Sequence, residues 1–197
     1  MDTKEAYFSV DVEASGPVPG DFSLLSIGAC LVGDPEQSFY RELKPINKRF
    51  VRDALAVSGL SLARLAQTGA EPKQAMREFG AWVRTTASNQ TPVMIAFNAG
   101  FDWAFVNWYF LHHSIDNPFG IGAVDIKSYY MGMVEASWEE SRSNQLAAPY
   151  RSTTRHTHNA LDDAKEQAGM FARMMVAMHG RTQVAASKRS DGTRRRP

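Results

Sequence analysis

The spacing of hydrophobic residues divides the chain into a strand-rich first part and a part in which helices and strands alternate. Residues 6–12 place apolar side chains at every second position, which is the two-residue period of a β-strand with one face in a core. Residues 24–32 and 38–43 are predicted as two further strands, separated by turn-forming Gly and Pro residues at 16–21 and 33–35. Because these connections are short, we expect the three strands to pair antiparallel.

Apolar positions take up helical spacing from residue 52 onward. A longer helix is predicted to open at Glu71 and Pro72, since proline is favoured in the first turn and one apolar face follows. The other predicted helices cover residues 52–57, 61–67, 102–112, 125–133 and 159–178, the last ending at Gly180, and two more strands cover residues 92–97 and 121–124. This order predicts an α/β protein with a mixed five-stranded sheet, in which three antiparallel strands are followed by two parallel ones and helices cover both faces.

Residues 1–180 are predicted to form one domain, since a chain of 197 residues suits one sizeable hydrophobic core. Residues 181–197 are predicted to be a disordered basic tail, because their basic residues are mixed with Gly, Ser and Thr without an apolar period. Five basic residues and one acidic residue give positions 188–197 a charge of +4, so the rest of the chain carries −3. The tail could contact phosphates non-specifically or only raise solubility, and the sequence leaves both open.

Two carboxylates, Asp11 and Glu13, lie two positions apart near the end of the first predicted strand. A strand directs alternate side chains to one face, so the two carboxylates project together. Like charges this close are unfavourable without a cation, and sites in open α/β sheets lie where strands end. The pair therefore predicts a metal-binding position, although two solvent-facing carboxylates would give the same pattern.

A third carboxylate, Asp102, stands at the start of the helix that follows the fourth predicted strand. Residues 98–100 form the turn that would place it. An acid at a helix start is also favoured by the free backbone N–H groups there, so Asp102 alone does not distinguish a ligand from a helix-stabilising residue.

Helical geometry distinguishes the two acids at the start of the last predicted helix. At about 100° per residue, Asp163 falls at the edge of the apolar stripe and Asp162 points towards solvent, so Asp163 is the better candidate ligand. His158 precedes the helix and can reach over its first turn. The apolar stripe consists of Ala160, Leu161, Ala164, Ala168, Phe171 and Met175.

Four carboxylates and one imidazole are the groups that a two-metal phosphodiester hydrolase uses. Oxygen ligands from carboxylates suit Mg²⁺ or Mn²⁺ rather than zinc. Bound cations would also let the domain, which is negatively charged outside its basic tail, bind nucleic acid.

The single cysteine, Cys30, can form neither an internal disulfide nor a cysteine cluster. No signal peptide pattern and no run long enough to span a bilayer occurs, which predicts a cytoplasmic protein without a membrane partner.

Three segments resemble, in order and spacing, the motifs of the DEDDh (DnaQ-like) 3'-5' exonuclease family: DVEASG at 11–16, NAGFD at 98–102 and HNALDD at 158–163. That family includes bacterial ribonuclease T, oligoribonuclease and the proofreading subunit of DNA polymerase III. The resemblance covers roughly residues 7–171, and the histidine five positions before the last aspartate is typical of the histidine branch. It implies an RNase H-like fold.

The resemblance also implies a role for each of the five residues. Asp11 would bridge two divalent ions, Glu13 and Asp163 would complete one ion site, and Asp102 would support the other. His158 would be the general base that takes the proton of the attacking water. The partner would be the 3' end of a single-stranded nucleic acid, and the product a nucleoside 5'-monophosphate. Several relatives form dimers, so a homodimer is a further expectation.

Substrate contacts are predicted at Ala14, Ser15, Phe101 and Arg155. Ala14 and Ser15 directly follow the first acidic pair, and Ala14 stands where relatives usually have a threonine that can contact the terminal nucleotide. Phe101 lies in the second motif and could stack on a base. Arg155 lies in the irregular polar segment 135–157, which could close over the 3' end and contact phosphate.

The sequence does not decide between RNA and DNA. We favour RNA or short oligonucleotides, because no polymerase-binding extension is evident. The alternatives are a DNA proofreading or repair exonuclease, an endonuclease for RNA–DNA hybrids on the same fold, and a degenerate nuclease module that binds nucleic acid or protein without catalysis. The five intact residues favour an enzyme, and the histidine spacing favours an exonuclease.

Overall fold

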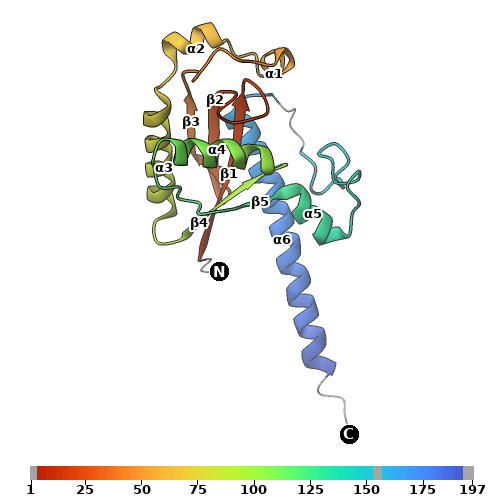
Figure 1. Cartoon of the computed structure of the whole chain (residues 1–197). Helices are drawn as coiled ribbons and strands as arrows, with labels where there is room; N and C mark the ends of the chain where they lie inside the picture. The colour runs from red at the N-terminus through yellow and green to blue at the C-terminus, as the bar shows by residue number, and fades with distance from the viewer. Residues whose placement is uncertain (1–3, 153–156, 193–197) are drawn as a thin grey trace.

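A computed structural model describes residues 4–152 and 157–192. Its centre is a five-stranded sheet in the order β3-β2-β1-β4-β5 (Figure 1). The strands are β1 (Glu5–Ala14), β2 (Leu24–Leu31), β3 (Asp34–Glu42), β4 (Thr91–Ala96) and β5 (Ala123–Asp125). β1, β2 and β3 pair antiparallel, whereas β4 pairs parallel with β1 and β5 pairs parallel with β4. The predicted α/β class, the five strands and their directions are confirmed.

Helices cover both faces of this sheet, as expected. They are α1 (Arg52–Ser58), α2 (Leu62–Thr68), α3 (Pro72–Ala87), α4 (Gly100–His112), α5 (Ile126–Val134) and α6 (Ala160–Gly192). One face of β1, carrying Phe8 and Val10, packs with α3 and α4. The opposite face of β1 meets α6, and α5 packs against α6 and β5. None of the helices in the described residues combines the length and the apolar character needed to cross a bilayer.

Two predicted boundaries differ from the structure by more than two residues. β3 begins at Asp34 rather than at residue 38, because the chain reverses at Val32 and Gly33 and pairing resumes immediately after them. The last helix does not end at Gly180 but continues to Gly192, and Figure 1 shows α6 running well past the sheet. Gly180 is not in the left-handed conformation that ends many helices, and an interior glycine costs a helix only about 1 kcal/mol. Residues 181–192 are therefore helical rather than irregular, and residues 193–197 of the predicted tail lie outside the described part.

Candidate active site

The predicted motifs meet at one cavity of about 470 Å³. It lies where the end of β1, the turn between β4 and α4, and the start of α6 come together. Its walls include the side chains of Asp11, Glu13, Asp102 and His158, together with Asn98, Phe101, Ser143, Glu166 and Gln167. Three segments that are far apart in the sequence therefore contribute to a single site.

The strand β1 places Asp11 and Glu13 on the face opposite the core residues Val10 and Val12. Both core residues are buried, whereas the two carboxylates are partly exposed, as the alternation predicts. Asp11 lies beside Gly28 of β2 in the antiparallel register. The expectation that both carboxylates share one face is confirmed.

The parallel pairing of β1 with β4 brings Asp102 to the same place. After β4 the chain turns at Asn98, which has a φ of 59°, and the Ala99 N–H donates to Asp125 Oδ2 at 2.8 Å. α4 then begins, and Asp102 in its first turn is only 4% exposed. Asp102 Oδ1 accepts a hydrogen bond of 3.0 Å from the Val12 N–H. The carboxylate of Asp102, in the second motif, is thus hydrogen-bonded to the backbone between Asp11 and Glu13.

The first turn of α6 separates Asp163 from Asp162 as the helical stripe predicts. Asp163 is 1% exposed, and its Oδ1 accepts a hydrogen bond from the Thr157 N–H at 3.1 Å. Asp162 is exposed. The helix start can approach the sheet closely because Gly28 has no side chain: a Cβ there would overlap the backbone of Ala160.

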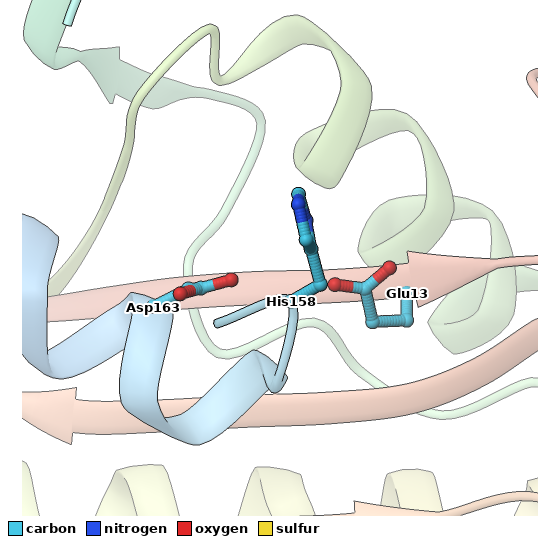
Figure 2. Close-up of side chains that lie close together, drawn as sticks. All are labelled: Glu13, His158 and Asp163. Carbon is cyan, nitrogen blue, oxygen red and sulfur yellow. The ribbon is translucent and has the colours of Figure 1, made fainter. Parts of the chain in front are cut away.

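Glu13, His158 and Asp163 form a group that could hold a metal ion. Each offers one potential ligand atom, and these atoms all lie within 4.8 Å of one another. Figure 2 shows the Glu13 carboxylate projecting from β1 and the Asp163 carboxylate from α6, with His158 between them. His158 is exposed, and its backbone has a φ of 56° in the segment before α6.

The electrostatics of the site favour a bound cation. Burial, followed by the charges of Asp102, Glu13 and Asp163, raises the pKa of Asp11 well above its usual value. Burial raises the pKa of Asp102 to about 8, and burial together with Asp163 raises the pKa of Glu13 to about 7. Carboxylates crowded in this way repel one another, and a divalent cation relieves the repulsion. The residues present therefore fit a hard cation with oxygen ligands.

Gln167, Glu166 and Ser143 line the cavity but were not predicted from the sequence, and Gln167 makes a direct contact with a carboxylate of the site. Gln167 is 5% exposed, and its Nε2 donates to Asp11 Oδ1 at 2.7 Å. Its position could have indicated this role, because Gln167 lies one helical turn after Asp163 and so shares its face. A polar side chain on the face that also carries the buried Ala164 and Ala168 needs a hydrogen-bonding partner.

Among the residues predicted to contact substrate, Phe101 lines the cavity and the others described in the structure do not. Phe101 is 41% exposed and lines the cavity, so it can meet a ligand there. Ala14 and Ser15 are buried and do not line the cavity. Arg155 lies outside the described residues.

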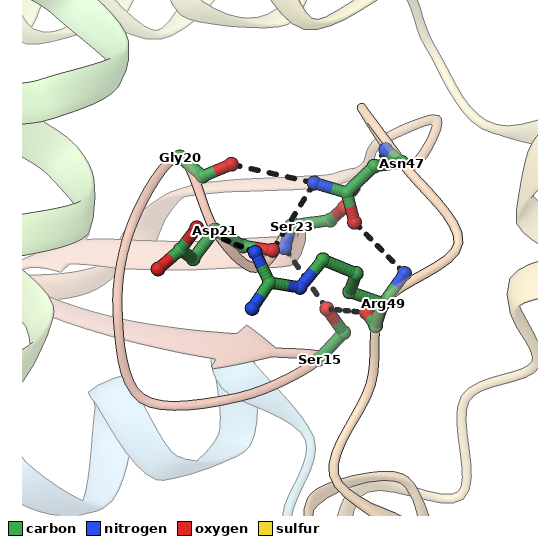
Figure 3. A network of polar contacts seen from close by, with 6 residues as sticks. All are labelled: Ser15, Gly20, Asp21, Ser23, Asn47 and Arg49. Carbon is green, nitrogen blue, oxygen red and sulfur yellow. Dashed lines mark hydrogen bonds and ion pairs between the residues drawn. The ribbon is translucent and has the colours of Figure 1, made fainter.

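Ser15 belongs instead to a network that joins the loop after β1 to the segment after β3 (Figure 3). Its hydroxyl donates to the Arg49 carbonyl at 2.9 Å and accepts from the Ser23 N–H at 2.9 Å. Arg49 Nη1 also pairs with Asp21 Oδ1 at 2.6 Å. The side chain that was expected to contact substrate therefore holds two loops together.

The fold and these side chains define the class of protein: a DEDDh-type nuclease with an RNase H-like fold. The nuclease domain of 3'hExo, a DEDDh family member solved with bound rAMP, matches with a TM-score of 0.72 at 14% identity, covering 87% of this chain and 92% of that one. A zinc-bound Escherichia coli ExoI–ssDNA complex matches with a TM-score of 0.65 at 14% identity, covering 90% of this chain and 41% of that one. Matches at such low identity support the fold.

Sequence similarity identifies the family to which the chain belongs. The family model described as 3'-5' exoribonuclease Rv2179c-like domain matches residues 6–175, and the chain belongs to this family. The 3'-5' DNA exonuclease Cap18 of Escherichia coli is 47% identical over 169 residues, which cover 85% of this chain and 90% of that protein. The expected membership of the DEDDh 3'-5' exonucleases is confirmed, and the chain is a nuclease enzyme.

Proposed function

We propose that this chain removes nucleotides one at a time from the 3' end of single-stranded nucleic acid, with two Mg²⁺ or Mn²⁺ ions, and releases nucleoside 5'-monophosphates. One observation carries the proposal: the side chains of Asp11, Glu13, Asp102 and His158 line a single cavity, and Asp163 lies within reach of Glu13 and His158. A binding module without catalysis would have no need of four carboxylates, two buried and two partly buried, that repel one another.

The four carboxylates would hold the cations. Asp11 is proposed to contact both ions, Glu13 and Asp163 to complete one site, and Asp102 to support the other. The short separation of the Glu13 and Asp163 ligand atoms supports their assignment to one ion. When bound, the ions would stabilise the negative charge that develops on the phosphate oxygens and on the attacking and leaving oxygens.

His158 is proposed as the general base. Its ring is exposed beside the cavity, where water and a phosphodiester can reach it. A neutral imidazole can accept a proton, because one ring nitrogen carries a free lone pair. The proton of the attacking water would pass to the ring as the oxygen bonds to phosphorus, and the bond from phosphorus to the 3' oxygen of the preceding nucleotide would break.

The comparisons support both DNA and RNA as the substrate. The 47% identity to a protein named as a DNA exonuclease favours single-stranded DNA, and we take it as the first substrate to test. The description of the family as an exoribonuclease domain favours RNA, the preference expected from the sequence. Phe101 at the cavity wall could stack on a base of either polymer, because every base has a flat aromatic face.

Digestion of matched oligonucleotides tests the proposal. Single-stranded DNA, single-stranded RNA and duplexes of one sequence would be labelled at the 5' end and incubated with Mg²⁺, Mn²⁺ or EDTA. We expect a ladder that shortens by single nucleotides from the 3' end of the single strands, and no products in EDTA. Full activity in EDTA would contradict the metal proposal, and internal cleavage would indicate an endonuclease.

A further inference from the structure

Gln167 connects two parts of the active site that lie far apart in the sequence. Its Nε2 donates to Asp11 Oδ1 at 2.7 Å, across 156 positions. Its Oε1 accepts from the Phe97 N–H at 2.8 Å, across 70 positions. The same side chain therefore contacts the acidic strand β1 and the end of β4, just before the turn that leads to Asp102.

The chemistry of the partners decides which way this amide points. The Phe97 N–H can only donate, so the atom that faces it has to be the oxygen of Gln167. The nitrogen then faces Asp11, and because an amide N–H can only donate, Asp11 Oδ1 is the acceptor. In this orientation the oxygen and the nitrogen of the amide each have a hydrogen-bonding partner. Because Gln167 is almost completely buried, water cannot easily replace either partner.

We propose that Gln167 is a positioning residue that holds the Asp11 carboxylate in the orientation required to bind divalent cations. The hydrogen bond occupies Asp11 Oδ1 from the side of α6 and restricts rotation of the carboxylate, so that Oδ2 keeps one direction. The hydrogen bond to Phe97 in turn fixes the amide of Gln167, because an amide bonded at both its oxygen and its nitrogen cannot rotate away from Asp11. Groups that orient a metal ligand in this way usually contribute substantially to metal affinity.

This inference rests on the proposed function, and metal binding tests it separately from catalysis. Gln167→Met keeps the length of the side chain and removes both hydrogen bonds. The Mn²⁺ dissociation constant of the whole chain would be measured by isothermal titration calorimetry. We expect Gln167→Met to weaken Mn²⁺ binding by about 10–100-fold. The matched control is Gln74→Met, which removes a hydrogen bond of 3.0 Å from a glutamine to a carboxylate, that of Glu78, on the exposed surface of α3, and it should bind Mn²⁺ like the wild type.

The same substitution made in an Asp11→Asn variant distinguishes a role of Gln167 in positioning Asp11 from a purely structural role. In Asp11→Asn, Glu13, Asp102 and Asp163 remain as ligands, and binding would be followed into the millimolar range. If Gln167 acts through Asp11, adding Gln167→Met there should cause no further loss of Mn²⁺ affinity.

The outcomes distinguish the two proposals. Wild-type Mn²⁺ affinity in Gln167→Met, or the same loss with and without the Asp11 carboxylate, would overturn the positioning role. The proposed function would fail on a different result, a wild-type protein that neither binds Mn²⁺ nor degrades oligonucleotides.

Discussion

Asp102 and Val12 are joined by a hydrogen bond of 3.0 Å, in which the backbone N–H of Val12 donates to Asp102 Oδ1. The bond crosses 90 positions of sequence and brings the α4 carboxylate to the strand position between Asp11 and Glu13. Asp102 therefore has two roles that can be separated: it accepts a structural hydrogen bond, and it carries charge into the site.

Asp102→Asn should separate these roles. The asparagine oxygen can still accept from Val12, so we expect a folded protein with an unchanged circular dichroism spectrum. Loss of the charge should lower kcat at least about 100-fold, since charge stabilisation at a reacting phosphate commonly has that magnitude. Kinetics on a labelled oligonucleotide would measure it. Activity within a few-fold of the wild type would show that Asp102 is not a metal ligand.

Asp163→Asn and Asp162→Asn form a matched pair on neighbouring residues of one helix turn. Because Asp163 is buried at the site and Asp162 is exposed, only the first change should abolish hydrolysis. Mn²⁺ titration and initial rates would be compared for the two variants. Equal damage from both would mean that the helical-face argument for Asp163 is wrong.

His158→Ala should lower kcat by roughly 10²–10⁴-fold, the range typical of a lost general base. The side chain is exposed, so the melting temperature should hardly change. His179→Ala, an exposed histidine further along α6, is the control and should leave the rate unchanged. A normal rate in His158→Ala would assign proton transfer to another group.

The metal-free protein should become less stable as the pH rises. The pKa of Glu13 is raised to about 7 and that of Asp102 to about 8, whereas both are near 4 in an unfolded chain. The folded state thus holds these protons more tightly, and the stability they contribute below about pH 4 is lost as the pH rises towards about 8. In EDTA we expect a lower melting temperature at about pH 8 than at about pH 6.

Two controls accompany this pH series. Excess Mg²⁺ should reduce the difference, because bound cations favour the ionised carboxylates. Asp102→Asn cannot titrate at this position and should also reduce it. A melting temperature in EDTA that increases over this interval would contradict the assignment of raised pKa values to the site.

Gly28→Ala should destabilise the protein and displace the start of α6. The added Cβ would overlap the backbone of Ala160 and Leu161, and such overpacking commonly costs about 1–3 kcal/mol. Urea unfolding would measure the loss, and Mn²⁺ affinity should decrease because Asp163 shifts with the helix. Gly33→Ala is the control, since a Cβ there meets no atom within 4 Å. Equal stability of the two variants would mean that α6 can move without cost.

The sequence by itself determined the strands, most helices and the faces on which the acidic residues lie. Alternation along β1 put Asp11 and Glu13 together, and the apolar stripe of α6 separated Asp163 from Asp162. These are effects of period two and period 3.6, which depend only on nearby residues. Where local signals compete, the sequence was a poorer guide, as at Gly180, where a glycine that can end a helix lies inside one.

Only the tertiary structure decided how the segments meet. Parallel pairing of β4 with β1 brings Asp102 to Val12, and the absence of a side chain at Gly28 lets α6 approach the sheet. Burial left Gln167 with Asp11 and Phe97 as hydrogen-bonding partners, and Ser15 with the neighbouring loops. These contacts join residues up to 156 positions apart. They depend on how the helices and strands pack, which no local pattern of hydrophobic and polar residues specifies.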